Sequence, residues 1–132
     1  MYEKLKKLSA DRMRYFASNM KDLVWYKGSE NYFDELPNEL QEAKEEDKIN
    51  NHVHLEDELW DVFWNYLMLL QSLKHEWKIR SIDSVIERAY SKFSERVGKD
   101  GHYGTEDQLD WETIKKWQKA RLKKEHQDKY WK

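Results

Sequence analysis

The sequence of residues 53–77 is VHLEDELWDVFWNYLMLLQSLKHEW. Apolar residues recur in it three and four positions apart, a spacing typical of an α-helix that lies against a core. This main stripe consists of Leu55, Leu59, Val62, Phe63, Tyr66, Leu69, Leu70, Leu73 and Trp77. Trp60, Trp64, Leu67 and Met68 follow the opposite side of the same helix. Because a helix that is apolar nearly all round is covered on both sides, we expect a central, buried helix here.

Four further helical segments are expected around this central one, at about residues 3–26, 30–47, 81–98 and 105–129. The chain of 132 residues contains only 4 glycines and 1 proline, so it encodes few turns and favours long helices over a sheet. Pro37 is expected either to interrupt the second segment or to start its main part. Ser81, or alternatively Ser84, is the expected N-cap of the fourth segment. The sequence therefore predicts an all-α bundle of four to five helices.

The start of the last segment carries a signal of its own. Residues 105–108, Thr-Glu-Asp-Gln, form a capping-box pattern. The helix that follows places Trp111, Ile114 and Trp117 on one side, and we expect that side to dock on the subunit core or on a neighbouring subunit.

The overall composition excludes several classes of protein. Charged residues make up 38% of the chain, but the net charge is only −2, which argues against a binder of nucleic-acid polymers or of membrane surfaces. The absence of cysteine excludes disulfides, cysteine zinc sites and cysteine nucleophiles. The first residues lack the apolar region of a signal peptide, and no apolar run approaches the roughly 18 residues needed to cross a bilayer. We therefore expect a cytoplasmic protein.

Four glutamates share one face of the second segment. They are Glu35, Glu39, Glu42 and Glu46, which fall within a stripe about 60° wide because successive helical residues turn by about 100°. Like charges at this spacing repel one another, and Lys44, the only lysine inside the segment, points elsewhere.

The central helix repeats this acidic pattern with Glu58 and Asp61, and Asn65 follows one turn further on. All three lie at the edge of the apolar stripe or just beyond it, where the helix meets its neighbours. Carboxylates in such a place need a cation or hydrogen-bond donors, and an all-carboxylate set suits Mg²⁺ or Mn²⁺. The alternative is that they are ordinary surface acids on charged helices.

A different metal chemistry finds less support. Di-iron helical bundles use a Glu-x-x-His pattern, and no histidine of this chain has a glutamate three residues before it. His52 and His54 lie next to the Asn50-Asn51 turn signal, where two exposed histidines more often bind nothing.

Basic residues form a stripe on the fourth segment, at Arg88, Lys92 and Arg96. A cationic stripe beside an apolar face can bind a polyphosphate through charge-assisted hydrogen bonds. The alternative is that Lys92 and Arg96 pair with the acidic stripes and that no ligand is involved.

Three motifs of the chain resemble those of the MazG-like family of all-α nucleoside triphosphate pyrophosphohydrolases. Residues 38–42, NELQE, resemble its E-E-x-x-E motif, residues 58–61, ELWD, its E-x-x-D motif, and residues 92–96, KFSER, its K-F-x-x-R motif. The resemblance extends over about residues 23–97. Asn38 stands in place of the first glutamate, and Tyr90 stands where many members have asparagine. The resemblance implies a MazG-like domain over residues 1–98, followed by a loop and helical extension over residues 99–132.

The resemblance also implies an activity, the Mg²⁺-dependent hydrolysis of a (d)NTP to the (d)NMP and pyrophosphate, with Mn²⁺ as a substitute metal and house-cleaning of the nucleotide pool as a role. The implied site residues are Glu39, Glu42, Glu58 and Asp61 as metal ligands, Glu46 as an extra ligand or general base, and Lys92, Arg96 and Asn65 as contacts of the substrate. The competing hypothesis is a non-catalytic helical interaction protein that retains the fold.

The two apolar sides of the central helix bear on assembly. A chain this short offers few helices to cover both apolar sides, so we predict a homodimer or homotetramer in which the core helices form an oligomeric bundle. The resemblance to the family implies an oligomer too. The alternative is that the first and last helices cover the second side within one subunit.

Overall fold

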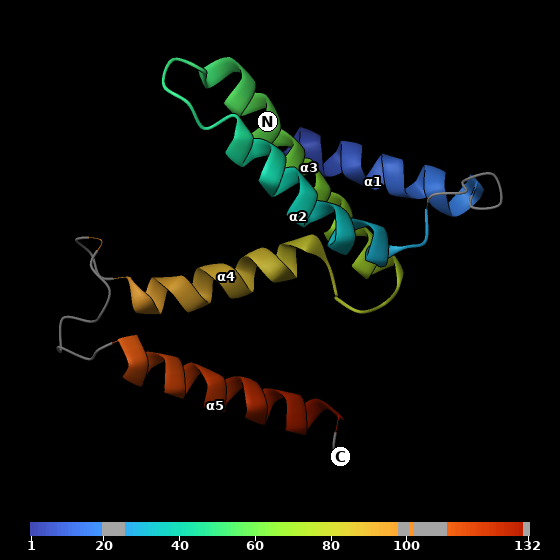
Figure 1. The fold of residues 1–132 in the computed structure, drawn as a ribbon. Helices are drawn as coiled ribbons and strands as arrows, with labels where there is room; N and C mark the ends of the chain where they lie inside the picture. Colours follow the sequence, from blue (N-terminus) through green and yellow to red (C-terminus); the bar gives the residue numbers. More distant parts are fainter. Residues whose placement is uncertain (20–25, 98–100, 102–110, 131–132) are drawn as a thin grey trace. The chain divides into compact units, whose positions relative to one another are not determined.

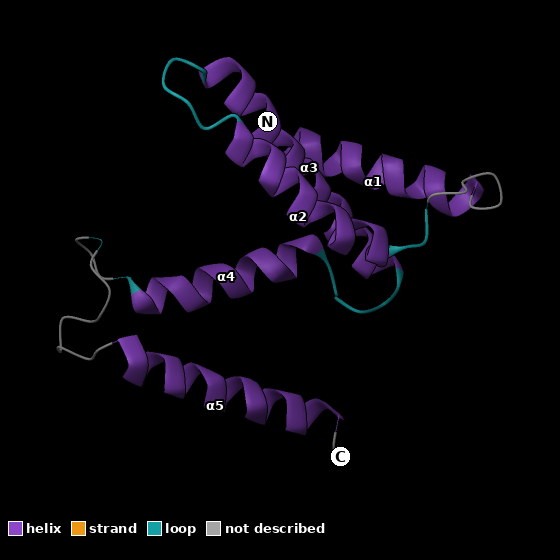
Figure 2. Ribbon diagram, viewed as in Figure 1, coloured by secondary structure: helices purple, strands orange, loops and turns teal. Residues whose placement is uncertain are grey.

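The computed structural model describes residues 1–19, 26–97, 101 and 111–130 of the chain. Every element of these residues is a helix: α1 (Tyr2–Asn19), α2 (Ser29–Glu45), α3 (His52–His75), α4 (Ile82–Arg96) and α5 (Trp111–Tyr130) (Figures 1 and 2). The predicted all-α fold is thus confirmed. The predicted end of the first segment, including Met20, Leu23 and Val24, and the capping pattern of residues 105–108 lie outside the described residues.

The chain divides into two compact units, Met1–Ser84 and Val85–Lys132. In the first unit α3 packs against both α1 and α2, and α2 runs beside α3 (Figure 1). Residues 67–72 of α3 are buried on every side, as expected for a helix between two others. The core cluster consists of Met13, Phe16, Tyr26, Tyr32, Met68 and Leu69, with Leu36, Trp64 and Leu73 packed against it.

Polar groups in this core bind one another. The ring of Tyr26 stacks on Phe16 with 4.6 Å between centroids, and its hydroxyl lies 3.2 Å from the Ser72 hydroxyl. Gln71 Nε2 donates to the Ser9 hydroxyl at 3.0 Å. A buried polar group is costly unless it is hydrogen-bonded, so these contacts fix α1 and the residues before α2 against α3.

The prediction for Pro37 was wrong in both of its forms. The helix α2 begins at Ser29 and continues through Pro37 to Glu45. Proline inside a helix removes one backbone donor, and its ring crowds the carbonyl four residues earlier. Before the proline, Tyr32 belongs to the core cluster and Leu36 packs against it; after the proline, Ala43 is buried. Packing on both sides of the proline therefore stabilises the continuous helix.

The main apolar stripe of the central helix is buried over only part of its predicted length. Leu59 and Tyr66 are 50% and 42% exposed, and Trp77 is 93% exposed. The core cluster reaches α3 only between Trp64 and Leu73, which leaves the earlier turns less covered. Trp77 lies beyond the end of the helix and has a positive φ of 60°, which turns the chain away from the helical path.

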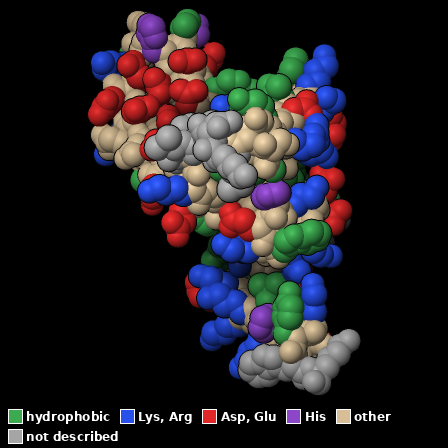
Figure 3. Space-filling view, turned by 90° about the vertical axis from the view of Figure 1, so that its right-hand side faces the viewer, with side chains coloured by type: hydrophobic (Ala, Val, Ile, Leu, Met, Phe, Trp, Pro, Cys, Tyr) green, Lys and Arg blue, Asp and Glu red, His purple; other side chains and the backbone are tan. Residues whose placement is uncertain are grey.

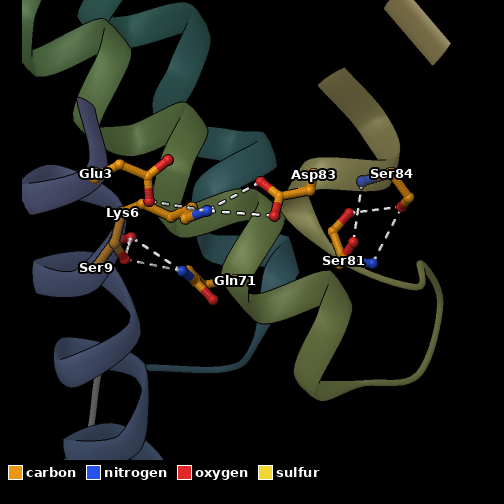
Figure 4. A network of polar contacts seen from close by, with 7 residues as sticks. All are labelled: Glu3, Lys6, Ser9, Gln71, Ser81, Asp83 and Ser84. Atoms are coloured by element: carbon orange, nitrogen blue, oxygen red, sulfur yellow. Dashed lines mark hydrogen bonds and ion pairs between the residues drawn. The ribbon is translucent and has the colours of Figure 1, made fainter. Parts of the chain in front are cut away.

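The start of α4 is fixed as the sequence predicts. The Ser84 backbone N–H donates to Ser81 Oγ at 3.0 Å, and the Ser81 N–H donates to Ser84 Oγ at 3.1 Å, a reciprocal cap (Figure 4). In the first turn of α4, Asp83 accepts a hydrogen bond of 3.0 Å from Lys6 of α1. These contacts confirm Ser81 as the N-cap and tie the beginning of α4 to α1.

The second unit contains most of α4 together with α5. Arg88 binds both carboxylate oxygens of Glu125, and Arg121 binds both of Glu95. Ile114 is buried as predicted, but Trp117 is 54% exposed, and the buried residue next to it is Gln118. The side of α5 that docks is therefore turned from the predicted one toward Gln118, which lies one helical turn after Ile114.

None of the helices in the described part of the chain combines the length and the apolar character that a membrane-spanning helix needs.

Candidate metal and nucleotide site

Three of the predicted carboxylates come together from two helices. Glu39 of α2 and Glu58 and Asp61 of α3 each offer a carboxylate oxygen, and these oxygens lie within 4.8 Å of one another. We call these three residues the carboxylate cluster. Figure 3 shows acidic side chains gathered on the part of the surface at its upper left, which belongs to the end of the α2–α3 pair where the two helices are connected.

Two oxygens of the cluster are buried without a hydrogen-bond partner in the described structure. They are Oε2 of Glu39 and Oε2 of Glu58. A buried carboxylate oxygen that binds nothing costs stability, and native proteins retain few such atoms. A cation bound between these carboxylates would give both oxygens a partner.

The pKa values of the cluster agree with this interpretation. Burial raises the pKa of Glu39 to about 7, and the Glu42 carboxyl adds to the shift through its charge and a hydrogen bond. Burial, followed by neighbouring negative charges that include Glu42, also raises the pKa of Glu58 and of Asp61. Among the described residues, the causes of these three shifts are burial and negative charges, and a divalent cation with oxygen ligands would compensate them.

Glu42 and Glu46 lie beside the cluster rather than in it. Glu42 is exposed, but its charge acts on all three members. The Glu46 carboxylate accepts a hydrogen bond of 2.7 Å from Asn51 Nδ2, and its charge contributes to the raised pKa of Glu58. Asn51 thus anchors Glu46 at the edge of the cluster.

Asp57 is an acidic neighbour that the sequence analysis did not single out. Its charge raises the pKa of both Glu58 and Asp61. It precedes Asp61 by four residues, the spacing that places two side chains on one helix face, and this spacing was a signal that could have identified it.

The predicted substrate contacts belong to different units, Asn65 to the first and Lys92 and Arg96 to the second. Asn65 donates from Nδ2 to the backbone oxygen of Asp61 at 2.8 Å, so this contact stays within α3. Lys92 is exposed, with its Nζ 5.5 Å from the centroid of the Phe93 ring. Arg96 is buried in the second unit, where its Nε donates to Gln118 Oε1 at 2.7 Å. Binding of substrate by these three residues stays a prediction.

A comparison with protein families adds an independent observation. Residues 27–99, just over half of the chain, match the model of the MazG nucleotide pyrophosphohydrolase domain. This chain belongs to the MazG family. The resemblance seen in the three motifs is thereby confirmed. A search of curated proteins and a search of solved structures each gave no match.

The MazG match spans α2, α3 and α4 and so contains every predicted site residue, whereas α1 and α5 lie outside it. The carboxylate cluster of this MazG domain provides hard oxygen donors, two of which have no hydrogen-bond partner among the described residues, and this set fits a hard divalent cation.

Proposed function

We propose that this chain is a Mg²⁺-dependent nucleoside triphosphate pyrophosphohydrolase that converts a (d)NTP to the (d)NMP and pyrophosphate. The observation that carries the proposal is the convergence of Glu39, Glu58 and Asp61 inside the stretch that matches the MazG domain. Two of these residues have a buried oxygen with no hydrogen-bond partner in the described part of the chain. Family membership supports the reaction class, and the cluster supports a metal-dependent form of it.

Glu39, Glu42, Glu58 and Asp61 would hold the metal, which is Mg²⁺ in this proposal with Mn²⁺ as a substitute. When bound, the ion would supply positive charge that neutralises the triphosphate and lowers the pKa of a bound water. Glu42 lies outside the carboxylate cluster, but we include it because its charge raises the pKa of all three members of the cluster.

The other predicted residues would act on the water and the triphosphate. Glu46 is anchored by Asn51, and a carboxylate held in this way can take the proton of the attacking water, or serve as an additional ligand. Lys92, Arg96 and Asn65 would bind the polyphosphate or the sugar. Attack of the water oxygen on the α-phosphorus breaks the bond to the bridging oxygen, and pyrophosphate leaves with that oxygen.

The alternative is a non-catalytic helical interaction protein with the same fold. The cluster itself argues against it, because orphaned carboxylate oxygens lower stability and a purely structural protein gains nothing from them. In the alternative, substitution of Glu39 or Glu58 would have no functional consequence.

Assembly into a homodimer or homotetramer belongs to the same proposal. Val53, Leu59 and Trp60 on the first turns of α3 are 65%, 50% and 50% exposed, and the Trp60 ring stacks on Phe63 at 5.1 Å. A second copy of the chain is the cover that we propose for these turns, since a group of large apolar side chains in water marks an interaction surface. The cytoplasmic location, the absence of a nucleic-acid polymer as partner and the house-cleaning role stay predictions.

The test is release of pyrophosphate from a panel of NTPs and dNTPs, with Mg²⁺ and with chelator. The panel includes the Glu58→Gln and Asp61→Asn variants, and Glu56→Gln as a control at an exposed acid of the same helix. We expect pyrophosphate only with Mg²⁺, its loss in the first two variants and wild-type release in the third. No pyrophosphate from any nucleotide would refute the proposal, and activity that survives both site substitutions would refute the metal site.

A further inference from the structure

One side chain of α5 binds both basic residues of the K-F-x-x-R motif. Arg96 Nε donates to Gln118 Oε1 at 2.7 Å, and Gln118 Nε2 donates to the backbone oxygen of Lys92 at 2.9 Å. Gln118 is only 7% exposed; its bond with Arg96 is buried, and its bond with the Lys92 backbone oxygen is partly buried. A single amide from outside the MazG match thus connects the two ends of a motif inside it.

The guanidinium of Arg96 is held on more than one side. Its Cζ lies 4.4 Å from the centroid of the Trp111 ring and 5.7 Å from that of Phe93, and the residue is 5% exposed. A planar guanidinium with one face on an indole ring and its Nε in a hydrogen bond has little freedom to rotate. The orientation of its terminal Nη groups, the fork that binds phosphate, is therefore set by α5.

The chemistry of this contact differs from that of the other arginine contacts between α4 and α5. Arg88 and Arg121 each bind a carboxylate, Glu125 and Glu95 respectively, which neutralises their charge. The partner of Arg96 Nε is instead a neutral amide. An amide orients the guanidinium and leaves its positive charge available to an anion, which a carboxylate would not.

We propose that Gln118 is a positioning residue that orients Arg96 for binding of the triphosphate. This inference rests on the proposed function, because it assigns Arg96 to the polyphosphate. The C-terminal helix, which lies outside the MazG match, then supplies part of the binding machinery of this chain. Preorganising a charged group in this way strengthens binding because less freedom is lost when the ligand arrives.

The experiment measures kcat and KM for pyrophosphate release by the full chain with Mg²⁺. Gln118→Met keeps the size of the side chain and removes both hydrogen bonds, whereas Gln118→Glu keeps the acceptor and adds a negative charge. Glu125→Gln is the control, because it weakens another contact between α4 and α5 without touching Arg96. We expect both Gln118 variants to raise KM about tenfold with little change in kcat. The control should leave KM unchanged, although its Tm should fall by as much as that of the Gln118 variants.

Other outcomes would overturn the inference. A wild-type KM in both Gln118 variants would mean that the contact is only structural, and a lower KM in Gln118→Met would mean that it sequesters Arg96. Binding of a non-hydrolysable α,β-methylene triphosphate, measured by calorimetry, separates this inference from the proposed function. If the wild type binds the analogue but releases no pyrophosphate, the proposed function fails, and weaker binding by Gln118→Met alone still supports the positioning role. If the wild type does not bind the analogue, both fail.

Discussion

Glu76, which follows the last residue of α3, accepts two hydrogen bonds from Ser29 at the start of α2. The Ser29 N–H lies 2.8 Å from Oε2, and its hydroxyl lies 2.9 Å from Oε1. The first N–H groups of a helix have no partner within the helix, so Glu76 acts as an N-cap supplied from the neighbouring helix. The contact fixes one end of the α2–α3 pair, and the carboxylate cluster is formed further along the same pair.

Removing the charge of Glu76 is expected to destabilise the protein. Burial works to raise its pKa, but the ion pair with Lys78 and the two hydrogen bonds from Ser29 outweigh burial and lower the pKa. Glu76→Gln should lower the free energy of unfolding in urea by about 1 kcal/mol at neutral pH, as the loss of a helix cap does. Glu87→Gln, at an exposed residue of α4, serves as the control and should have no such effect.

The pH dependence of this difference has a definite sign. Because the folded pKa of Glu76 is lowered, its stabilisation is fully present above the unfolded value of about 4.3 and is lost as the pH falls through the folded pKa. The wild type and Glu76→Gln should therefore converge in acid. A difference in stability that persists or grows as the pH falls would contradict this account of the cap.

Gly28 is predicted to tolerate no side chain. Its φ is 86°, a conformation that residues with a Cβ rarely adopt, and an added Cβ would lie 3.0 Å from Glu76 Oε2. Gly28→Ala should lower the free energy of unfolding by on the order of 2 kcal/mol, measured in urea. Unchanged stability would show that neither the backbone strain nor the approach of Glu76 limits this position.

A divalent metal should stabilise the protein through the carboxylate cluster. Mg²⁺ at about a hundred times its Kd is expected to add about 2.7 kcal/mol to the free energy of unfolding, seen as a rise in Tm. Glu39→Gln should abolish this rise, and it should make the metal-free protein more stable at neutral pH because one of the mutually repelling, partly buried charges is gone.

The matched control for this prediction is Glu35→Gln. Glu35 lies on the same acidic stripe of α2 but is exposed and outside the cluster. It should keep the full response to Mg²⁺. An equal loss of response in both variants would indicate a diffuse effect of negative charge instead of a site.

The exposed turns of α3 lead to a prediction about assembly. Trp60→Glu places a charge on the apolar surface that we assign to a second copy, and it should shift the protein to a monomer in light scattering after size exclusion. Trp117→Glu, at a similarly exposed tryptophan of α5, is the control and should leave the assembly unchanged. A monomeric wild type would rule out this use of the surface.

The helices and most of the cluster follow from spacing in the sequence. Glu58 and Asp61 fall at the edge of an apolar stripe, and in the structure their oxygens meet that of Glu39. Periodicity gives the face of a helix, however, and does not give its partner. The spacing therefore placed Leu59 in the core, whereas in the structure the early turns of α3 are less covered and Leu59 is half exposed. The role of Gln118 could not be predicted from the sequence, because a buried glutamine is recognised only by the groups that it binds.

Proline illustrates the same limit at the level of the backbone. The local rule for Pro37 predicts a break or a helix start. In the structure α2 continues past this residue, and its packing against α3 stabilises the uninterrupted helix. Local preferences of this size are routinely outweighed by tertiary contacts.

The most direct test of the central claim is the fate of the oxygen from labelled water. The claim is that the carboxylate site directs water to the α-phosphorus of a nucleoside triphosphate. In H₂¹⁸O with Mg²⁺, mass spectrometry of the products should find one ¹⁸O in the nucleoside monophosphate and none in pyrophosphate. Label in pyrophosphate or in inorganic phosphate, or the absence of hydrolysis of every nucleotide tested, would contradict the claim.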